Sequence, residues 1–185
     1  LASLSGFYYT DAEETSSYQK ADLPEQTDLS LLDYADTATD CTMEKGSEGI
    51  TVSNLGADPN VVFPGVASCF ADNDKLYGLS LTVDAPDETE MAVYYQTEGD
   101  EGFSAEKVYT FKVTEDNRTW EHLVPGGITE LRVDVSSPVE SAVINNFELK
   151  SCDITESGYT ALKESGVDEV TFSDSTYQAQ VTNDA

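Results

Sequence analysis

From Ile50 onward, apolar and polar residues alternate with a period of two, which is the pattern of β-strands with one buried face. Turn-forming sequences rich in Pro, Gly, Asp and Asn separate these stretches, and no amphipathic helical repeat lies between them. The pattern predicts an all-β fold, an antiparallel β-sandwich (jelly roll) with at most one or two short helices. The clearest alternating stretches are 79–83, 91–96, 109–113, 131–135 and 143–149, and a short helix is expected at 159–165.

The two ends of the chain differ in composition from this alternating region. Residues 1–40 are acidic, rich in Ser, Thr and Asp, and without periodicity, so we expect an N-terminal segment or linker. The sandwich module is expected at 41–152, followed by a C-terminal extension at 153–185. Either the extension is an arm of the same domain, or it begins a second module. The start at Leu1 and the absence of a visible signal peptide favour a piece of a longer protein.

Charge limits the classes of partner. The chain of 185 residues carries 9 basic and 36 acidic residues, a formal net charge of −27. Such a field repels nucleic acids and anionic membrane surfaces, and no apolar run is long enough to span a bilayer. We therefore expect no nucleic-acid partner and no membrane span, and an extracellular or cell-surface location, where acidity favours solubility.

The order of strands over residues 91–149 carries a family resemblance. A strand with paired tyrosines at 94 and 95 is followed by the acidic loop Glu-Gly-Asp-Glu-Gly-Phe and by a Trp-containing strand. The segments Leu-Arg-Val-Asp-Val and Ile-Asn-Asn-Phe-Glu-Leu close the region. This arrangement resembles the galactose-binding-like jelly-roll modules, which include many carbohydrate-binding modules. It is also similar to β-sandwich accessory domains of bacterial cell-surface glycosyltransferases.

The resemblance implies two further features. In such modules the last strand lies beside the first, which would bring Cys152 close to Cys41 and allow a disulfide, with Cys69 as the remaining free thiol. In the alternative, all three cysteines are free thiols. Such modules also often hold a structural calcium ion. Asp58, Asp72 and Asp74 are carboxylates in turns, as calcium requires, although Asp is common in turns for other reasons.

A carbohydrate site needs exposed aromatic faces with planar polar groups beside them. If Met91, Val93 and Tyr95 face the core, Tyr94 and Gln96 face outward; if Leu123 faces the core, Trp120 and His122 point the other way, in phase with Arg118. The candidate carbohydrate-binding residues are therefore Tyr94, Gln96, Arg118, Trp120 and His122. In the alternative, Trp120 is inside and anchors the core. Phe103, in the acidic loop, is expected to plug the end of the sandwich.

Catalysis finds little support in the sequence. It contains no nucleophile-elbow, zinc-protease or phosphate-loop motif, and its single histidine has no partner at a spacing typical of a catalytic pair. We expect no cofactor other than the calcium ion just mentioned. The sequence thus predicts a non-catalytic, monomeric, carbohydrate-binding module of a secreted or cell-surface bacterial protein, with a glycan or cell-wall polysaccharide as partner. The alternative is a structural accessory domain without a ligand of its own.

Overall fold

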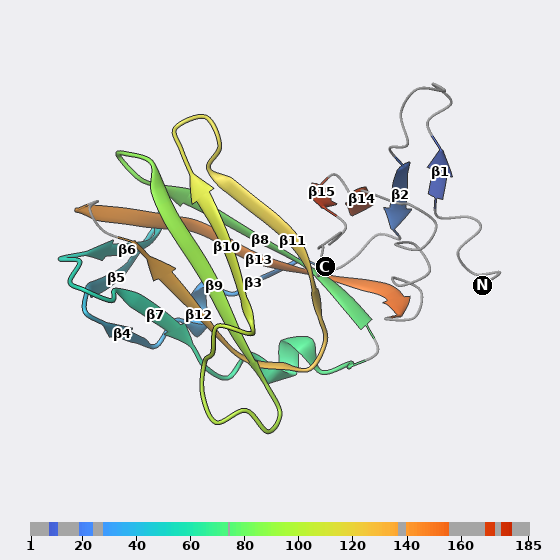
Figure 1. Ribbon diagram of the computed structural model, residues 1–185, viewed down its shortest axis with the longest axis horizontal. Helices are drawn as coiled ribbons and strands as arrows, with labels where there is room; N and C mark the ends of the chain where they lie inside the picture. Colours follow the sequence, from blue (N-terminus) through green and yellow to red (C-terminus); the bar gives the residue numbers. More distant parts are fainter. Residues whose placement is uncertain are drawn as a thin grey trace.

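The computed structural model describes residues 8–10, 19–23, 28–73, 75–136, 140–155, 169–172 and 175–178. Within these residues the chain forms two β-sheets and two short 3-10 helices, η2 (Leu32–Tyr34) and η3 (Val66–Phe70). The strands of the two sheets lie over one another in two layers (Figure 1). The predicted all-β sandwich is confirmed. No helix among the described residues is long and apolar enough to cross a membrane.

The larger sheet has the strand order β1-β2-β14-β15-β11-β8-β13-β6-β5, with β3 paired to β13. The smaller sheet has five strands in the order β10-β9-β12-β7-β4. The strands of the larger sheet are β1 (Tyr8–Thr10), β2 (Gln19–Leu23), β3 (Asp28–Ser30), β5 (Thr42–Gly46), β6 (Gly49–Ser53), β8 (Lys75–Asp84), β11 (Thr119–Pro125), β13 (Ser141–Thr155), β14 (Glu169–Phe172) and β15 (Ser175–Gln178). Those of the smaller sheet are β4 (Thr37–Thr39), β7 (Asn60–Phe63), β9 (Thr89–Thr97), β10 (Val108–Val113) and β12 (Ile128–Val135).

Strand pairing from β3 to β13 is antiparallel throughout the described residues, as the sequence predicts. Parallel pairs join β11 to β15 and β14 to β2, at the end of the larger sheet where the two flanks of the chain add strands. Between β8 and β13 the chain crosses repeatedly from one sheet to the other. Residues distant in sequence therefore meet across the space between the sheets.

The core lies between the sheets and is built from the inward phase of each alternating strand. Leu79, Leu81 and Val83 of β8 are fully buried, as are Leu131 and Val133 of β12. All five occupy the apolar phase identified in the sequence. Burying a side chain of this size stabilises the fold by about 1.5 to 3 kcal/mol. The alternation therefore positions residues 132 and 134 of β12, which lie between the buried positions, on the outer surface of the smaller sheet.

The turn between β5 and β6 makes a close backbone contact with β13. Gly49 has φ +122°, and a Cβ atom there would collide with the carbonyl oxygen of Ile144. At the same place the register of β13 against β8 shifts between Ile144 and Asn146. The Asn145 side chain donates a hydrogen bond to the carbonyl oxygen of Glu48 (3.2 Å). Only a residue without a side chain fits position 49 in this backbone.

The module boundaries differ from those expected. Residues 28–39, assigned from sequence to a linker, supply β3, η2 and β4, and β4 is an edge strand of the smaller sheet. β13 continues to Thr155, past the expected end at 152. Very short strands of three residues carry too few alternating positions to reveal a period, which is why they escaped detection. The helix expected at 159–165 lies outside the described residues.

Candidate functional site

Two of the five predicted carbohydrate-binding residues share the outer face of the smaller sheet. Tyr94 and Gln96 lie on β9 in the phase opposite to Met91 and Val93, which are buried. Both side chains are partly exposed. The alternation of β9 predicted this orientation, and the structure confirms it.

Trp120 and His122 instead point between the sheets, at the side of the sandwich where β11 lies opposite β10. The Trp120 ring stacks on Phe111 with the ring centroids 4.9 Å apart and the planes at 9°. Tyr109 lies 5.5 Å from Trp120 and 4.6 Å from His122, measured between ring centroids. The alternative in which Trp120 packs against the core is therefore the one realised. Leu123, in the opposite phase of β11, is also buried, at 2% exposed. The expectation that a buried Leu123 would place Trp120 on the outer surface is therefore wrong.

His122 is fixed within this aromatic cluster by its own backbone neighbour. Its Nδ1 lies 2.7 Å from the carbonyl oxygen of Leu123, so Nδ1 carries the hydrogen and donates. Burial lowers the pKa of His122, and the hydrogen bond to Leu123 only partly opposes that effect. The ring is therefore neutral at pH 7 and is part of the packing between the sheets.

Arg118 belongs to neither group. It precedes β11 and is exposed, and its Nη1 forms an ion pair with Asp84 Oδ1 at 3.3 Å. Its carbonyl oxygen accepts a hydrogen bond from the backbone N–H of Val83 (2.9 Å). The five predicted residues are thus split among an outer sheet face, an interior cluster and a loop.

The outer face of the smaller sheet carries a guanidinium flanked by aromatic rings. Arg132 of β12 is the direct cross-strand partner of Tyr94, and its Cζ lies 4.3 Å from the Tyr94 ring centroid. The same Cζ lies 5.2 Å from the ring centroid of Phe103. Cation–π contacts within about 6 Å are attractive, so both rings help to hold the guanidinium in place. We refer to Tyr94, Gln96, Phe103, Glu130, Arg132 and Asp134 as the sheet-face platform.

Asp134 fixes the orientation of Arg132. The Nε and Nη2 atoms of Arg132 donate to the two carboxylate oxygens of Asp134 at 2.7 and 2.8 Å. The side chains of Arg132 and Asp134 are 21% and 17% exposed. Burial raises the pKa of the Asp134 carboxyl, against the lowering effect of Arg132, and nearby Asp58 raises it further. Fork-to-fork pairing of this kind holds both side chains in one plane.

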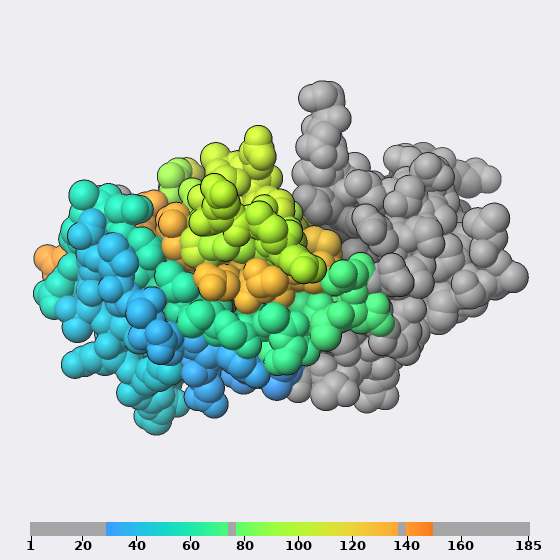
Figure 2. Space-filling model, turned by 90° about the horizontal axis from the view of Figure 1, so that it is seen from below, coloured from blue at the N-terminus to red at the C-terminus, as the bar shows by residue number. Residues whose placement is uncertain are grey.

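The loop between β9 and β10 places Phe103 over Arg132. Asp100 Oδ2 accepts hydrogen bonds from the Thr97 N–H (2.8 Å) and from Lys107 Nζ (2.6 Å). Lys107 lowers the pKa of Asp100 through that hydrogen bond, with a further contribution from Thr97. Figure 2 shows the yellow-green segment around this loop projecting beyond the orange surface of β12. Phe103 therefore caps the outer sheet face, and the expectation that it plugs the end of the sandwich is wrong.

The sequence predicted only two of the six platform residues, Tyr94 and Gln96, as binding residues and missed the other four. Glu130, Arg132 and Asp134 form the outward phase of β12, which the same alternation defines when Leu131 and Val133 are placed inside. What the sequence does not contain is the register between β9 and β12, which sets Arg132 beside Tyr94. Pairing between strands separated by about 35 residues depends on tertiary packing.

The predicted calcium ligands are not gathered in one place. Asp58 lies near the C-terminal end of β12, because the backbone N–H of Val135 donates to the carbonyl of residue 59. Asp72 follows η3 and lies at the opposite end of β12, because the backbone N–H of Gly127 donates to the carbonyl of Phe70. β12 spans roughly 25 Å at about 3.3 Å per residue, so Asp58 and Asp72 cannot ligate one ion. Asp74 lies outside the described residues. Those residues contain no group of three or more His, Cys, Asp or Glu side chains suited to a metal.

The disulfide implied by the family resemblance is not formed. Cys41 and Cys69 are free thiols. Cys41 precedes β5, which pairs with β6, and Ser53 at the end of β6 lies opposite Ser141 at the start of β13. Cys152 is 11 residues farther along β13, roughly 35 Å at about 3.3 Å per residue. The first and last strands do lie in one sheet, but their register sets the two cysteines at opposite ends.

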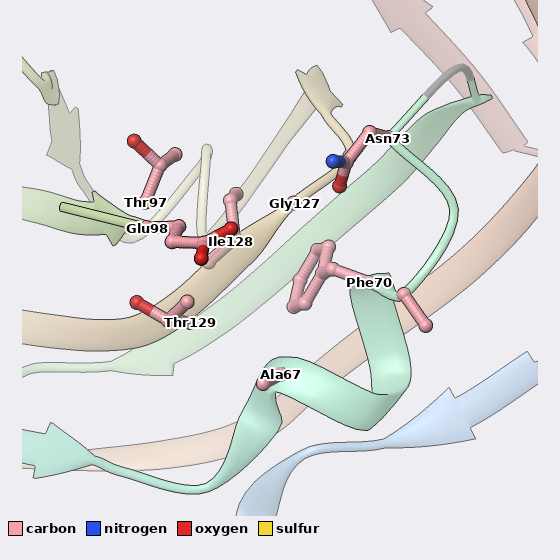
Figure 3. A pocket seen from close by; sticks show the side chains of 10 residues that line it. Ala67, Phe70, Asn73, Thr97, Glu98, Gly127, Ile128 and Thr129 are labelled. Carbon is pink, nitrogen blue, oxygen red and sulfur yellow. The ribbon is translucent and has the colours of Figure 1, made fainter.

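A separate hollow of about 510 Å³ lies at the end of the sandwich near η3 (Figure 3). The Asn73 side chain lies over Gly127, and Phe70 points from the end of η3 toward the strand that carries Ile128 (Figure 3). Phe70 is fully buried, so it presents no free ring face to a ligand. The sheet-face platform has partly exposed rings and is therefore the better candidate site. The residues lining the hollow are Ala67, Phe70, Ala71, Asn73, Thr97, Glu98, Gly126, Gly127, Ile128 and Thr129.

The sequence matches no protein-family model and no curated protein. Solved structures with a similar fold include carbohydrate-binding modules. The C-terminal family 6 module of the laminarinase LamC from Zobellia galactanivorans is 14% identical, with a TM-score of 0.43, over 68% of this chain and 99% of that one. The second N-terminal cellulose-binding domain of β-1,4-glucanase C from Cellulomonas fimi is 15% identical, with a TM-score of 0.46, over 68% and 95%.

A family 6 module from lichenase 5A of Cellvibrio mixtus, in complex with cellotriose, is 10% identical. Its TM-score is 0.40, and the match covers 70% of this chain and 98% of that one. Similarity at these identities concerns the fold alone, because sandwiches of this kind carry many functions. The function has to be derived from the residues of the site.

Proposed function

We propose that the sheet-face platform binds carbohydrate and that this chain is a non-catalytic carbohydrate-binding module. The observation that carries the proposal is the guanidinium of Arg132, held by Asp134 and flanked by the rings of Tyr94 and Phe103. Sugars present C–H groups to aromatic rings and hydroxyl groups to planar polar side chains. The platform offers both kinds of surface on one exposed sheet face.

The proposed division of roles follows from the contacts. Tyr94 and Phe103 provide the ring surfaces. Arg132 retains Nη1, which has no protein partner among the described residues, as a donor for a sugar hydroxyl. Gln96 and Glu130 are direct cross-strand partners on the same face and extend the polar surface along the sheet. Because the pair with Asp134 fixes Arg132 before any ligand arrives, little side-chain entropy is lost on binding.

The cellular setting is part of the same proposal. Net charge of −27 favours a soluble, mutually repelling surface, which supports a monomeric module in a secreted or cell-surface bacterial protein. In that setting the module would hold its parent protein against a glycan or cell-wall polysaccharide. Calcium binding by the loop of Asp58 or that of Asp72 alone is a separate question, which thermal unfolding with and without added calcium answers.

The test uses two matched pairs of variants and a glycan array followed by calorimetric titration. Cellotriose is the first soluble probe, since the Cellvibrio mixtus module was solved with it. Tyr94→Ala should weaken binding by about tenfold, from the loss of one aromatic contact of about 0.5 to 1.5 kcal/mol and its buried area, while Tyr94→Phe retains the ring and most of the affinity.

Arg132→Lys is compared with Arg118→Lys, the same chemical change at an exposed arginine outside the platform. Arg132→Lys removes a planar donor and should reduce affinity several-fold, whereas Arg118→Lys should leave it unchanged. Circular dichroism and thermal unfolding establish that each variant is folded. If the unmodified protein binds nothing on the array, the chain is a structural accessory domain and the proposal is wrong.

A further inference from the structure

The outward phase of β12 carries two carboxylates and one guanidinium, in the order Glu130, Arg132, Asp134. Asp134 is engaged with Arg132 through both of its oxygens. The Glu130 side chain makes no hydrogen bond or ion pair with any described residue, yet Glu130 is half-buried on the platform beside Gln96. The platform therefore has one carboxylate more than it has cations, and that carboxylate is available to a ligand.

Every basic side chain that the structure describes, Arg132 included, already contacts a carboxylate or a backbone carbonyl. Of the five basic side chains that the structure describes, four form ion pairs with carboxylates, and Lys45 donates to the backbone carbonyl of Asp33. An anionic ligand that approached Arg132 would compete with Asp134 and face a net charge of −27. Like-charge juxtaposition of this kind disfavours binding, and opposite charge favours both encounter and affinity.

We propose that the platform selects glycans that carry protonated amines, with an ammonium group paired to Glu130 and the sugar ring against Tyr94, and that it rejects glycans carrying carboxylates. This inference rests on the proposed carbohydrate-binding function and defines its ligand class. The ligand is a polymer of amino sugars with free amines. The ammonium donates to Glu130, while Arg132 stays paired with Asp134.

The experiment compares three trimers with the same β-1,4 linkage. The glucosamine trimer carries an ammonium at carbon 2, cellotriose carries a hydroxyl there, and the glucuronic acid trimer carries carboxylates. Titrations are run at about pH 6, where sugar amines are protonated and Glu side chains are ionised. The glucosamine trimer should bind about tenfold more tightly than cellotriose at low ionic strength, and the glucuronic acid trimer should bind most weakly. The preference should shrink as added salt shortens the Debye length.

Two variants with the same change in net charge separate the local effect from the global field. Glu130→Gln removes the free carboxylate of the platform. Glu115→Gln makes the same change in an exposed turn beyond the far end of β10. The preference for the glucosamine trimer should fall several-fold in Glu130→Gln and persist in Glu115→Gln.

The outcomes distinguish the two levels of the proposal. If cellotriose binds as well as the glucosamine trimer, or if the two variants lose the preference equally, charge selection by Glu130 is overturned while carbohydrate binding stands. If none of the three trimers binds and the glycan array is silent, the proposed function itself fails, and the ligand class falls with it.

Discussion

Truncation of Trp120 tests whether this residue belongs to the core or to the binding surface. Its ring stacks on Phe111 with the centroids 4.9 Å apart and contacts Tyr109 at 5.5 Å. Removing a fully buried tryptophan costs about 3 to 5 kcal/mol, and one aromatic pair contributes about 0.5 to 1.5 kcal/mol of that. Because Trp120 is only partly buried, we expect Trp120→Ala to lower the free energy of unfolding by about 2 to 4 kcal/mol.

Urea denaturation followed by circular dichroism measures this loss. With an m-value of about 2 kcal/mol per M, a loss of that size lowers the midpoint by about 1 to 2 M. Trp120→Phe keeps a stacked ring on Phe111 and should retain most of the stability, so it gives a reading if Trp120→Ala does not fold. Affinity of folded Trp120→Phe for the ligands of the platform should equal that of the unmodified protein, since the ring lies between the sheets.

Tryptophan fluorescence provides the independent check. Trp120 is the single tryptophan, so its emission reports this position alone. We expect a blue-shifted maximum that glycans do not change. The reasoning would be refuted by a Trp120→Phe variant with unchanged stability and abolished glycan binding, because such a result puts the ring on the binding surface.

Three further predictions concern the fold. Gly49→Ala should destabilise the protein by at least about 2 kcal/mol, because residue 49 has φ +122° and its side chain would meet the Ile144 carbonyl; Gly102→Ala, where nothing lies within 4 Å, is the control for the urea midpoint. Burial lowers the pKa of His122 below its unfolded value of about 6.5, so its contribution to the free energy of unfolding is present above about pH 6.5 and is lost as the pH falls through the folded pKa. Urea midpoints measured between about pH 5 and 7 should show this loss in the unmodified protein and not in the His122→Phe variant. Raising sodium chloride from about 0.01 to 1 M should raise the urea midpoint, because the Debye length falls from about 30 to 3 Å and the net charge of −27 is screened. A midpoint that does not depend on salt would show that repulsion among the acidic side chains is negligible.

Part of this protein follows from local sequence alone. Alternation with a period of two fixed the strands β8, β9, β10, β12 and β13 and the inward side of β8 and β12, because a pleated strand sends successive side chains to opposite faces. The same rule placed Tyr94 and Gln96 on an outer face. It left the side of Trp120 open, because β11 has buried apolar side chains in both phases, so alternation there cannot identify the inner side.

The candidate site itself depends on contacts that span long stretches of chain. The neighbourhood of Tyr94 and Arg132 comes from the register between β9 and β12, and the position of Phe103 comes from a loop closed by Asp100 and Lys107. Register also separates Cys41 from Cys152, which the family resemblance implied to be close together. A strand pattern specifies which face a residue occupies, whereas its neighbours on that face are chosen by the packing of the whole sandwich.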